Sequence, residues 1–295
     1  MSGINTNRTN ITLPTEVSAE IMQKTQEQSA VMALARKIAL PGRGLTIPVI
    51  TGDPEASWVD ETAIKPVSNP SLSTKIMQGY KLAVIVPFSD EFRRDMAGLY
   101  DALVARLPLA LAQKFDATVF HGAAPGSNFD TLASVTAQTI SGNGNSVYKA
   151  LVAADTAIAT AGGLCNGFAI SAQGKGELLT AVDSTGRPLF VNSVAEGAVP
   201  RILGNPVAYS KAAYKDGTSG QNATPDVLGF AGDWTQAVYG VVEGVKIDMS
   251  DTATLTISNA LTSLWERNMF AVRAEIEIGF RCDTSCFNKI TRTHA

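Results

Sequence analysis

The chain has 295 residues and a formal net charge of −3, and 45% of its residues are hydrophobic while only 17% are charged. A charged fraction below the roughly 25% of an average soluble domain fits a protein that buries much of its surface against partners. Basic residues are interspersed with acidic ones, and no basic run is longer than the pair Arg93–Arg94, which argues against specific nucleic-acid binding.

The beginning of the chain carries no recognisable targeting signal. Its first residues, MSGINTNRTNITLPTE, lack the apolar core and small-residue cleavage site of a signal peptide. No stretch approaches the ~18 apolar residues of a membrane span. The polar residues 1–15 predict a loose arm, and the apolar spacing within 16–38 predicts a short helix after it.

Two β-branched runs, at 46–50 and 80–88, predict strands that bracket a long polar segment rich in proline. Connections inside compact domains have a median length of about 4–6 residues, so a segment of this length without a core is either disordered or ordered by something outside the subunit. We therefore expect a long hairpin that lies on a neighbouring molecule.

A long helix is predicted over 91–121. Apolar residues recur every three or four positions from Phe92 to Val119, and Ser89 and Asp90 offer an N-cap. Such a helix is on the order of 46 Å long at ~1.5 Å per residue. Pro108 predicts a bend, and Gly122 predicts the end of the helix.

The middle of the chain, 141–262, reads as one α/β lobe. It is expected to hold a helix at 147–161 with Tyr148 on its apolar face, a buried strand at 168–171 and a short helix at 176–182. Strands are expected at 202–210, 227–235 and 239–249. After it, apolar and charged residues alternate over 272–281, which predicts a half-buried strand that pairs near the strand preceding the long helix.

Residues that could support catalysis or metal binding are few. The three cysteines are expected to be reduced, inert thiols. GKG at 174–176 lacks the serine or threonine of a phosphate loop, so a turn is the better interpretation. The two histidines leave little for a catalytic triad, and His121 is interpreted as a cap near the negative end of the long helix. We expect no catalytic, cofactor-binding or metal site, and no enzyme.

The order of these elements, together with several short motifs, resembles the major capsid proteins of tailed bacteriophages. The motifs run along nearly the whole chain: LPTEVSAEI, ASWVDE, YKLAVIVPFSDEFRRD, FDATVFHG, LGNPV, GFAGDW and ERNMFAVRAEIEIGF. The resemblance implies an α+β fold of the Hong Kong phage type. It implies an N-terminal arm and short helix at 1–40, an extended loop at 41–80, a peripheral domain at 81–140 and 263–295, and an axial domain at 141–262.

The resemblance also implies a function and partners. Subunits of that family form hexamers and pentamers of an icosahedral shell, first a procapsid and then a mature head, which encloses double-stranded DNA without specific contacts. Portal and head-completion proteins would join the shell, assembly would take place in the host cytoplasm, and no membrane is involved. No long charged helical leader precedes the arm, so either that segment has been removed or a separate scaffolding protein does its work, and we expect the second.

Carried over onto this sequence, the resemblance places Trp58 and Glu61 in the extended loop and Arg93 and Arg94 at the start of the long helix. With Lys65, also in the loop, these residues are the expected contacts between subunits. No motif places the lysine, asparagine and glutamate of a covalent cross-link. Alternatives that stay open are an encapsulin-type shell around protein cargo and, less favoured, a hydrolase.

Overall fold

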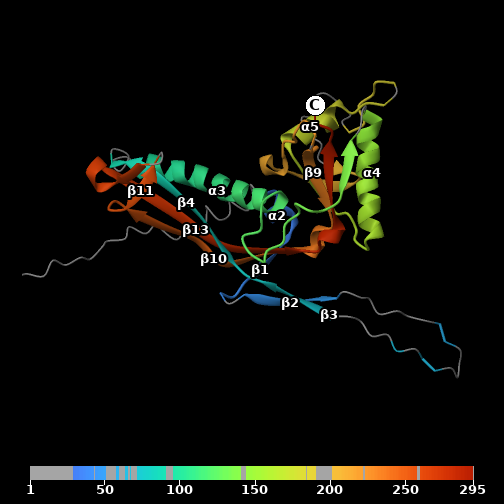
Figure 1. The fold of residues 1–295 in the computed structure, drawn as a ribbon, viewed down its shortest axis with the longest axis horizontal. Helices are drawn as coiled ribbons and strands as arrows, with labels where there is room; N and C mark the ends of the chain where they lie inside the picture. The colour runs from blue at the N-terminus through green and yellow to red at the C-terminus, as the bar shows by residue number, and fades with distance from the viewer. Residues whose placement is uncertain are drawn as a thin grey trace, which may run out of the picture.

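A computed structural model of the chain describes residues 29–42, 44–50, 58–59, 64–65, 67, 72–90, 96–140, 144–183, 185–190, 201–221, 223–257 and 260–294. Figure 1 shows an elongated body with a four-stranded sheet under one long helix and a second sheet at the other end. A hairpin leaves the body near its middle. The mixture of helices and sheets is the expected α+β class.

The four-stranded sheet has the order β1 (Arg36–Ala39), β10 (Ala237–Ser250), β13 (Met269–Cys282) and β4 (Tyr80–Ser89). β13 is antiparallel to both neighbours, so the predicted pairing of the alternating strand with the strand before the long helix is confirmed. The expected strand at 239–249 does not stay with the middle lobe: it is β10, which pairs with β13 in the four-stranded sheet.

The long helix α3 (Met96–Phe120) lies along this sheet and runs unbroken through Pro108. The first residues of the predicted helix, 91–95, lie outside the described residues. Leu107 and Leu111 pack against the apolar side of β13 and β10, whereas Phe115 and Val119 reach a second core shared with the other sheet. α3 therefore joins the two halves of the molecule.

The six-stranded sheet has two layers of helix around it. Alternate residues of its buried strands face opposite sides, as Phe168 packs with α4 and α5 while Ala169 packs with α2 and α3. The helices are α2 (Ala30–Leu34), α4 (Gly144–Thr160) and α5 (Ala172–Thr180). The strand order is β5 (Ala137–Ile140), β14 (Phe287–Arg292), β9 (Asp226–Gly232), β6 (Gly167–Ile170), β8 (Asn205–Tyr209) and β7 (Arg201–Ile202).

Several expected elements differ in detail. Tyr148 is 46% exposed, and Val147 takes its place on the buried face of α4 beside Leu151, Ala154 and Ile158. α5 begins at Ala172 and not at 176, since Ser171 caps it by accepting the Gly174 N–H. The expected first helix ends at Leu34, and Ile38 lies in β1, which pairs in parallel with β10.

The remaining described elements are short. A small hairpin, β11 (Thr254–Ile257) and β12 (Ala260–Ser263), lies beside the start of α3 in Figure 1. β2 (Leu45–Ile50) and β3 (Leu72–Met77) form the projecting hairpin. No helix among the described residues is long and apolar enough to cross a membrane. The single-turn helices are η2 (Lys211–Ala213), η3 (Trp234–Gln236), η4 (Trp265–Arg267) and η5 (Thr284–Cys286).

Candidate functional site: the extended hairpin and its base

The projecting hairpin is formed by β2 and β3, paired from Leu45 opposite Met77 to Ile50 opposite Leu72. The sequence predicted one bracketing strand correctly, but it placed the second at 80–88. That strand is β4 of the four-stranded sheet, and the hairpin's own second strand, LSTKIM, was missed. Its mixture of serine, threonine and lysine hid it among the polar residues of the loop.

The hairpin joins the body at the end of β3, at Met77 and Gln78, which we call the neck. Backbones approach one another closely there. Met77, at the end of β3, is fully buried with Leu40 and Val238. Gly240 and Gly279 lie opposite each other on β10 and β13 under this side chain. A Cβ on Gly279 would stand 2.5 Å from the Gln78 carbonyl oxygen, and one on Gly240 would stand 2.8 Å from Met77 Sδ. Only glycine leaves room for the neck here.

Charged hydrogen bonds hold the same neck from the side. Arg281 donates from Nη2 to the Ile76 carbonyl at 2.6 Å and from Nη1 to Asp130 Oδ1 at 2.8 Å. Lys75 donates to the Cys282 carbonyl at 3.0 Å and lies 3.6 Å from Asp130 Oδ2. Charge-assisted bonds of this kind are about twice as strong as neutral ones, so the direction of the hairpin is fixed at its base.

Beyond β2 and β3 the described residues expose large apolar side chains. Trp58, Ile64 and Val67 are almost completely solvent-exposed, and Lys65 is exposed beside them. Of the expected contact residues, Trp58 and Lys65 are therefore accessible. The three others, Glu61, Arg93 and Arg94, lie outside the described residues.

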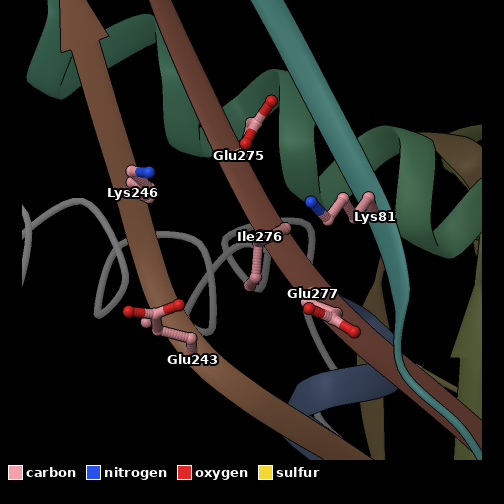
Figure 2. Close-up of a pocket in the computed structure, with 7 residues that line it drawn as sticks. Lys81, Glu243, Lys246, Glu275, Ile276 and Glu277 are labelled. Carbon is pink, nitrogen blue, oxygen red and sulfur yellow. The ribbon is translucent and has the colours of Figure 1, made fainter. Parts of the chain in front are cut away.

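The outer face of the four-stranded sheet is strongly charged. Glu243 and Glu277 face each other on β10 and β13, with Lys81 opposite Glu277 on β4. Figure 2 shows these side chains around a shallow hollow. Mixed charges on an exposed sheet face suit water or a polar partner surface better than an apolar ligand. The hollow is lined by Lys81, Glu243, Gly244, Lys246, Glu275, Ile276 and Glu277.

One fully buried carboxylate, Asp116 of α3, joins three parts of the chain. Its oxygens accept hydrogen bonds from the hydroxyls of Ser29 at 2.6 Å and Ser210 at 2.7 Å. They also accept hydrogen bonds from the backbone N–H groups of Ala30 at 3.0 Å and Val31 at 3.4 Å. Burial raises the pKa of Asp116 above its usual value, against the lowering effect of these four donors. The carboxylate ties the start of α2 and the end of β8 to the long helix.

The residues weighed for catalysis have structural roles. His121 hydrogen-bonds to the Ala213 carbonyl at 3.1 Å, and burial lowers its pKa to about 4, so it is neutral and the expected charged cap is wrong. GKG lies inside α5 and not in a turn. There Gly174 packs on β9, since a Cβ would stand 2.7 Å from the Leu228 carbonyl oxygen.

The cysteines and the acidic cluster near the end of the chain are also accounted for. All three thiols are free, as expected, and all three are buried; burial raises the pKa of Cys165 to about 11. Asp216, Asp226 and His294 come together, but Arg292 already donates to Asp226 at 2.9 Å. Burial would raise the pKa of Asp226, but bonds from Arg292, the Gly217 N–H and His294 outweigh it and lower the pKa to about 2.

A protruding hairpin, a long helix beneath a sheet and a second mixed lobe match a known family. The model of the phage capsid family matches residues 9–282. The chain belongs to the phage capsid family. The probable major capsid protein gp17 of Mycobacterium phage L5 is 30% identical over 300 residues, covering 96% of this chain and 90% of that protein. The protein of the same name from Mycobacterium phage D29 is 28% identical over 295 residues, with 95% and 89% covered.

Solved structures share the fold of this capsid protein. A chain of Gordonia phage Cozz has a TM-score of 0.70 at 23% identity, covering 91% of this chain and 87% of that one. A chain of Mycobacterium phage Ogopogo has a TM-score of 0.71 at 18% identity, covering 90% and 92%. A chain from the capsid of an empty GTA particle has a TM-score of 0.60 at 15% identity, covering 90% and 97%.

These matches decide the main expectations. The protein is a structural capsid protein and part of the virion, and it is not an enzyme. Capsid proteins assemble into oligomeric shells, which accounts for the low share of charged residues. The matches do not favour the encapsulin alternative.

Proposed function

We propose that this capsid protein forms hexamers and pentamers that close into an icosahedral procapsid and then a mature head around double-stranded DNA. The observation that carries the proposal is the hairpin: its base is locked to the body, while Trp58, Ile64 and Val67 stand in solvent beyond it. Burying a large apolar side chain contributes about 1.5–3 kcal/mol, so a neighbouring subunit gains much by covering them.

The predicted contact residues divide into apolar and charged groups. Trp58 would insert into the neighbouring subunit, and Glu61 and Lys65 would pair with charges on it. Arg93 and Arg94, before α3, are the proposed counterparts of Glu61. The mixed charges on the outer face of the four-stranded sheet offer partners of both signs.

The proposed division into domains follows the expected arm at 1–40, loop at 41–80, axial domain at 141–262 and peripheral domain at 81–140 with 263–295. Three strands qualify these boundaries. β10 lies within 141–262 but pairs with β13, whereas β14, within 263–295, and β5, within 81–140, belong to the six-stranded sheet. A division by sheet would move these three strands.

We further propose assembly in the host cytoplasm with a separate scaffolding protein, followed by portal and head-completion proteins. DNA contacts would be non-specific, because the net charge is only −3 and no basic cluster is present in the sequence. Neither a membrane nor a cofactor has a part in the proposal.

Electron microscopy of the expressed protein tests the proposal. Icosahedral shells or six- and five-membered capsomers are expected, alone or after co-expression with a scaffolding protein. Particles that remain single subunits under both conditions would contradict it. Nucleic acid or protein inside the shells distinguishes a genome container from a cargo shell.

Reversing one charge in the loop tests the role of the hairpin. Glu61→Lys is expected to impair assembly while the subunit stays folded, because it places a cation opposite Arg93 and Arg94. The matched control is Glu266→Lys, at an exposed residue of η4 away from the hairpin. Normal shells from Glu61→Lys, with circular dichroism unchanged, would count against the charged contact.

A further inference from the structure

A groove runs between the edge strand β5 and one flank of α4. Because α4 returns antiparallel to β5, two hollows lie end to end along them. The helical flank is on the order of 22 Å long at ~1.5 Å per residue. The segment 134–140 beside it is on the order of 20 Å long at ~3.3 Å per residue. The helical side is formed by Ser146, Lys149, Ala153, Ala157, Thr160 and Ala161.

The outer edge of β5 carries backbone N–H and C=O groups that can pair with another strand. β5 pairs in parallel with β14, with Lys289 opposite Ala137 and its N–H bonded to the Thr136 carbonyl. In this register the N–H and C=O groups of Ala137 and Thr139 point away from β14, towards the groove. No other strand among the described residues lies beyond β5.

β5 also lacks the protection that the other sheet edges carry. Edge strands are usually guarded by charged residues or proline. Among the described edges of the two large sheets, β1 has two cations, β4 has a lysine and a proline, and β7 has an arginine. β5 has the sequence AQTI, with neither a charge nor a proline. The edge of β5, which has neither charge nor proline and lies beside small alanine side chains of α4, can accept an added strand.

A buried polar atom at one end of the groove lacks a hydrogen-bond partner. Asn288, which lines the end near η5, is 2% exposed, and its Oδ1 has no partner among the described residues. Buried polar atoms nearly always have a partner, and an unmet acceptor costs about 1–3 kcal/mol. A segment that fills the groove and carries side-chain N–H donors would meet this need.

We propose that the groove binds an extended segment of this chain, residues 7–13, as an added strand on β5. Residues 14–28, which separate this segment from Ser29, can span about 50 Å at ~3.3 Å each, more than twice the length of the groove. The sequence NRTNITL alternates, with Ile11 and Leu13 on one face and Asn10 and Thr12 on the other.

The chemistry of this segment fits the groove. Ile11 and Leu13 are large enough to fill the space above Ala153 and Ala157, and Asn7, which lies on the same face of the strand, supplies an amide donor for Asn288 Oδ1. Residues 1–15 contain no acidic side chain, and Pro14, which cannot donate to a ladder, ends the pairing. The proposal is independent of hexamers and pentamers, because it concerns one strand and one groove.

A cysteine scan tests the pairing directly. Ala137→Cys is combined with single cysteines at each position from 9 to 13 in the full chain, and mild oxidation is followed by non-reducing electrophoresis. Cross-linking that rises and falls with a period of two is expected, within one subunit or between two, because alternate side chains of an added strand face the same side. The native thiols are buried and compete little. Ala124→Cys, exposed and away from the groove, is the matched control.

Hydrogen exchange provides the second test. Ala137→Pro removes an N–H that points to the groove and leaves the bonds to β14, whereas Ala137→Ser keeps it. Removal of residues 1–14 is expected to speed exchange at Thr139 about ten-fold, the equivalent of one lost hydrogen bond. With residues 1–14 present, Ala137→Pro should likewise speed exchange at Thr139, and Ala137→Ser should not. Uniformly weak cross-linking across positions 9–13, or Thr139 exchange unchanged by the truncation, overturns the proposal whether or not shells form.

Discussion

Asp116→Ala is expected to destabilise the subunit by about 2–4 kcal/mol. The carboxylate is fully buried and accepts four hydrogen bonds, from Ser29, Ala30, Val31 and Ser210. The two hydroxyls can rotate towards other acceptors, but the two backbone N–H groups at the start of α2 cannot. Each buried donor left without a partner costs about 1–3 kcal/mol. The benefit of removing a buried charge offsets part of this loss.

The assay is urea denaturation of the unassembled subunit, with exchange of the α2 amides as a local probe. Asp116→Asn should fall between the wild type and Asp116→Ala, because its amide oxygen still accepts from one side. Glu266→Ala, at an exposed residue, is the control and should change the free energy of unfolding by less than about 0.5 kcal/mol. A loss below about 1 kcal/mol for Asp116→Ala, with α2 exchange unchanged, would refute the reasoning.

Four further outcomes are expected. Gly279→Ala should destabilise the subunit by about 1–3 kcal/mol, read by thermal unfolding, because its Cβ would meet a backbone oxygen at 2.5 Å. Gly176→Ala, within α5 and with open space around it, should instead stabilise by up to about 1 kcal/mol. Arg281→Ala should loosen the hairpin base, giving faster proteolysis between 45 and 77 and fewer shells, while Arg281→Lys restores only part. Folding lowers the pKa of the His121 side chain to about 4. As the pH falls, the unfolded chain therefore binds a proton at this histidine before the folded subunit does. Stability should therefore fall as the pH drops below about 6.5 and through 4, and His121→Gln should reduce this dependence in a pH series of denaturation curves.

Local patterns predicted much of the fold. The alternation from Val272 to Phe280 fixed both the strand and its buried face, since all five apolar residues of the pattern are buried. The spacing on the long helix correctly placed Leu107, Leu111 and Phe115 in the core. These predictions succeeded because each depends on periodicity within one element.

Periodicity within one element could not predict which strands pair with one another. β10 and β14 are both apolar strands followed or preceded by ordinary turns, and nothing local says which sheet receives them. The candidate site shows the same limit. Arg281 looked like one more charge on the solvent face of an alternating strand, yet its partners Ile76 and Asp130 are more than 150 residues away in sequence. Asp116 offered a weak signal, as an acid among buried residues of the helix.

The hairpin base and the residues beyond it have opposite properties, and together they suit a shell subunit. Met77, Gly279 and Arg281 fix the direction of the hairpin before any neighbour arrives, so little entropy is lost there on docking. Trp58 has no contact that fixes it to its own subunit's core, as its side chain is almost completely exposed. A subunit that forms both pentamers and hexamers, as proposed, needs contacts that can adjust. A base fixed to the body and exposed apolar side chains beyond it would let one sequence make the same kind of contact with each neighbour.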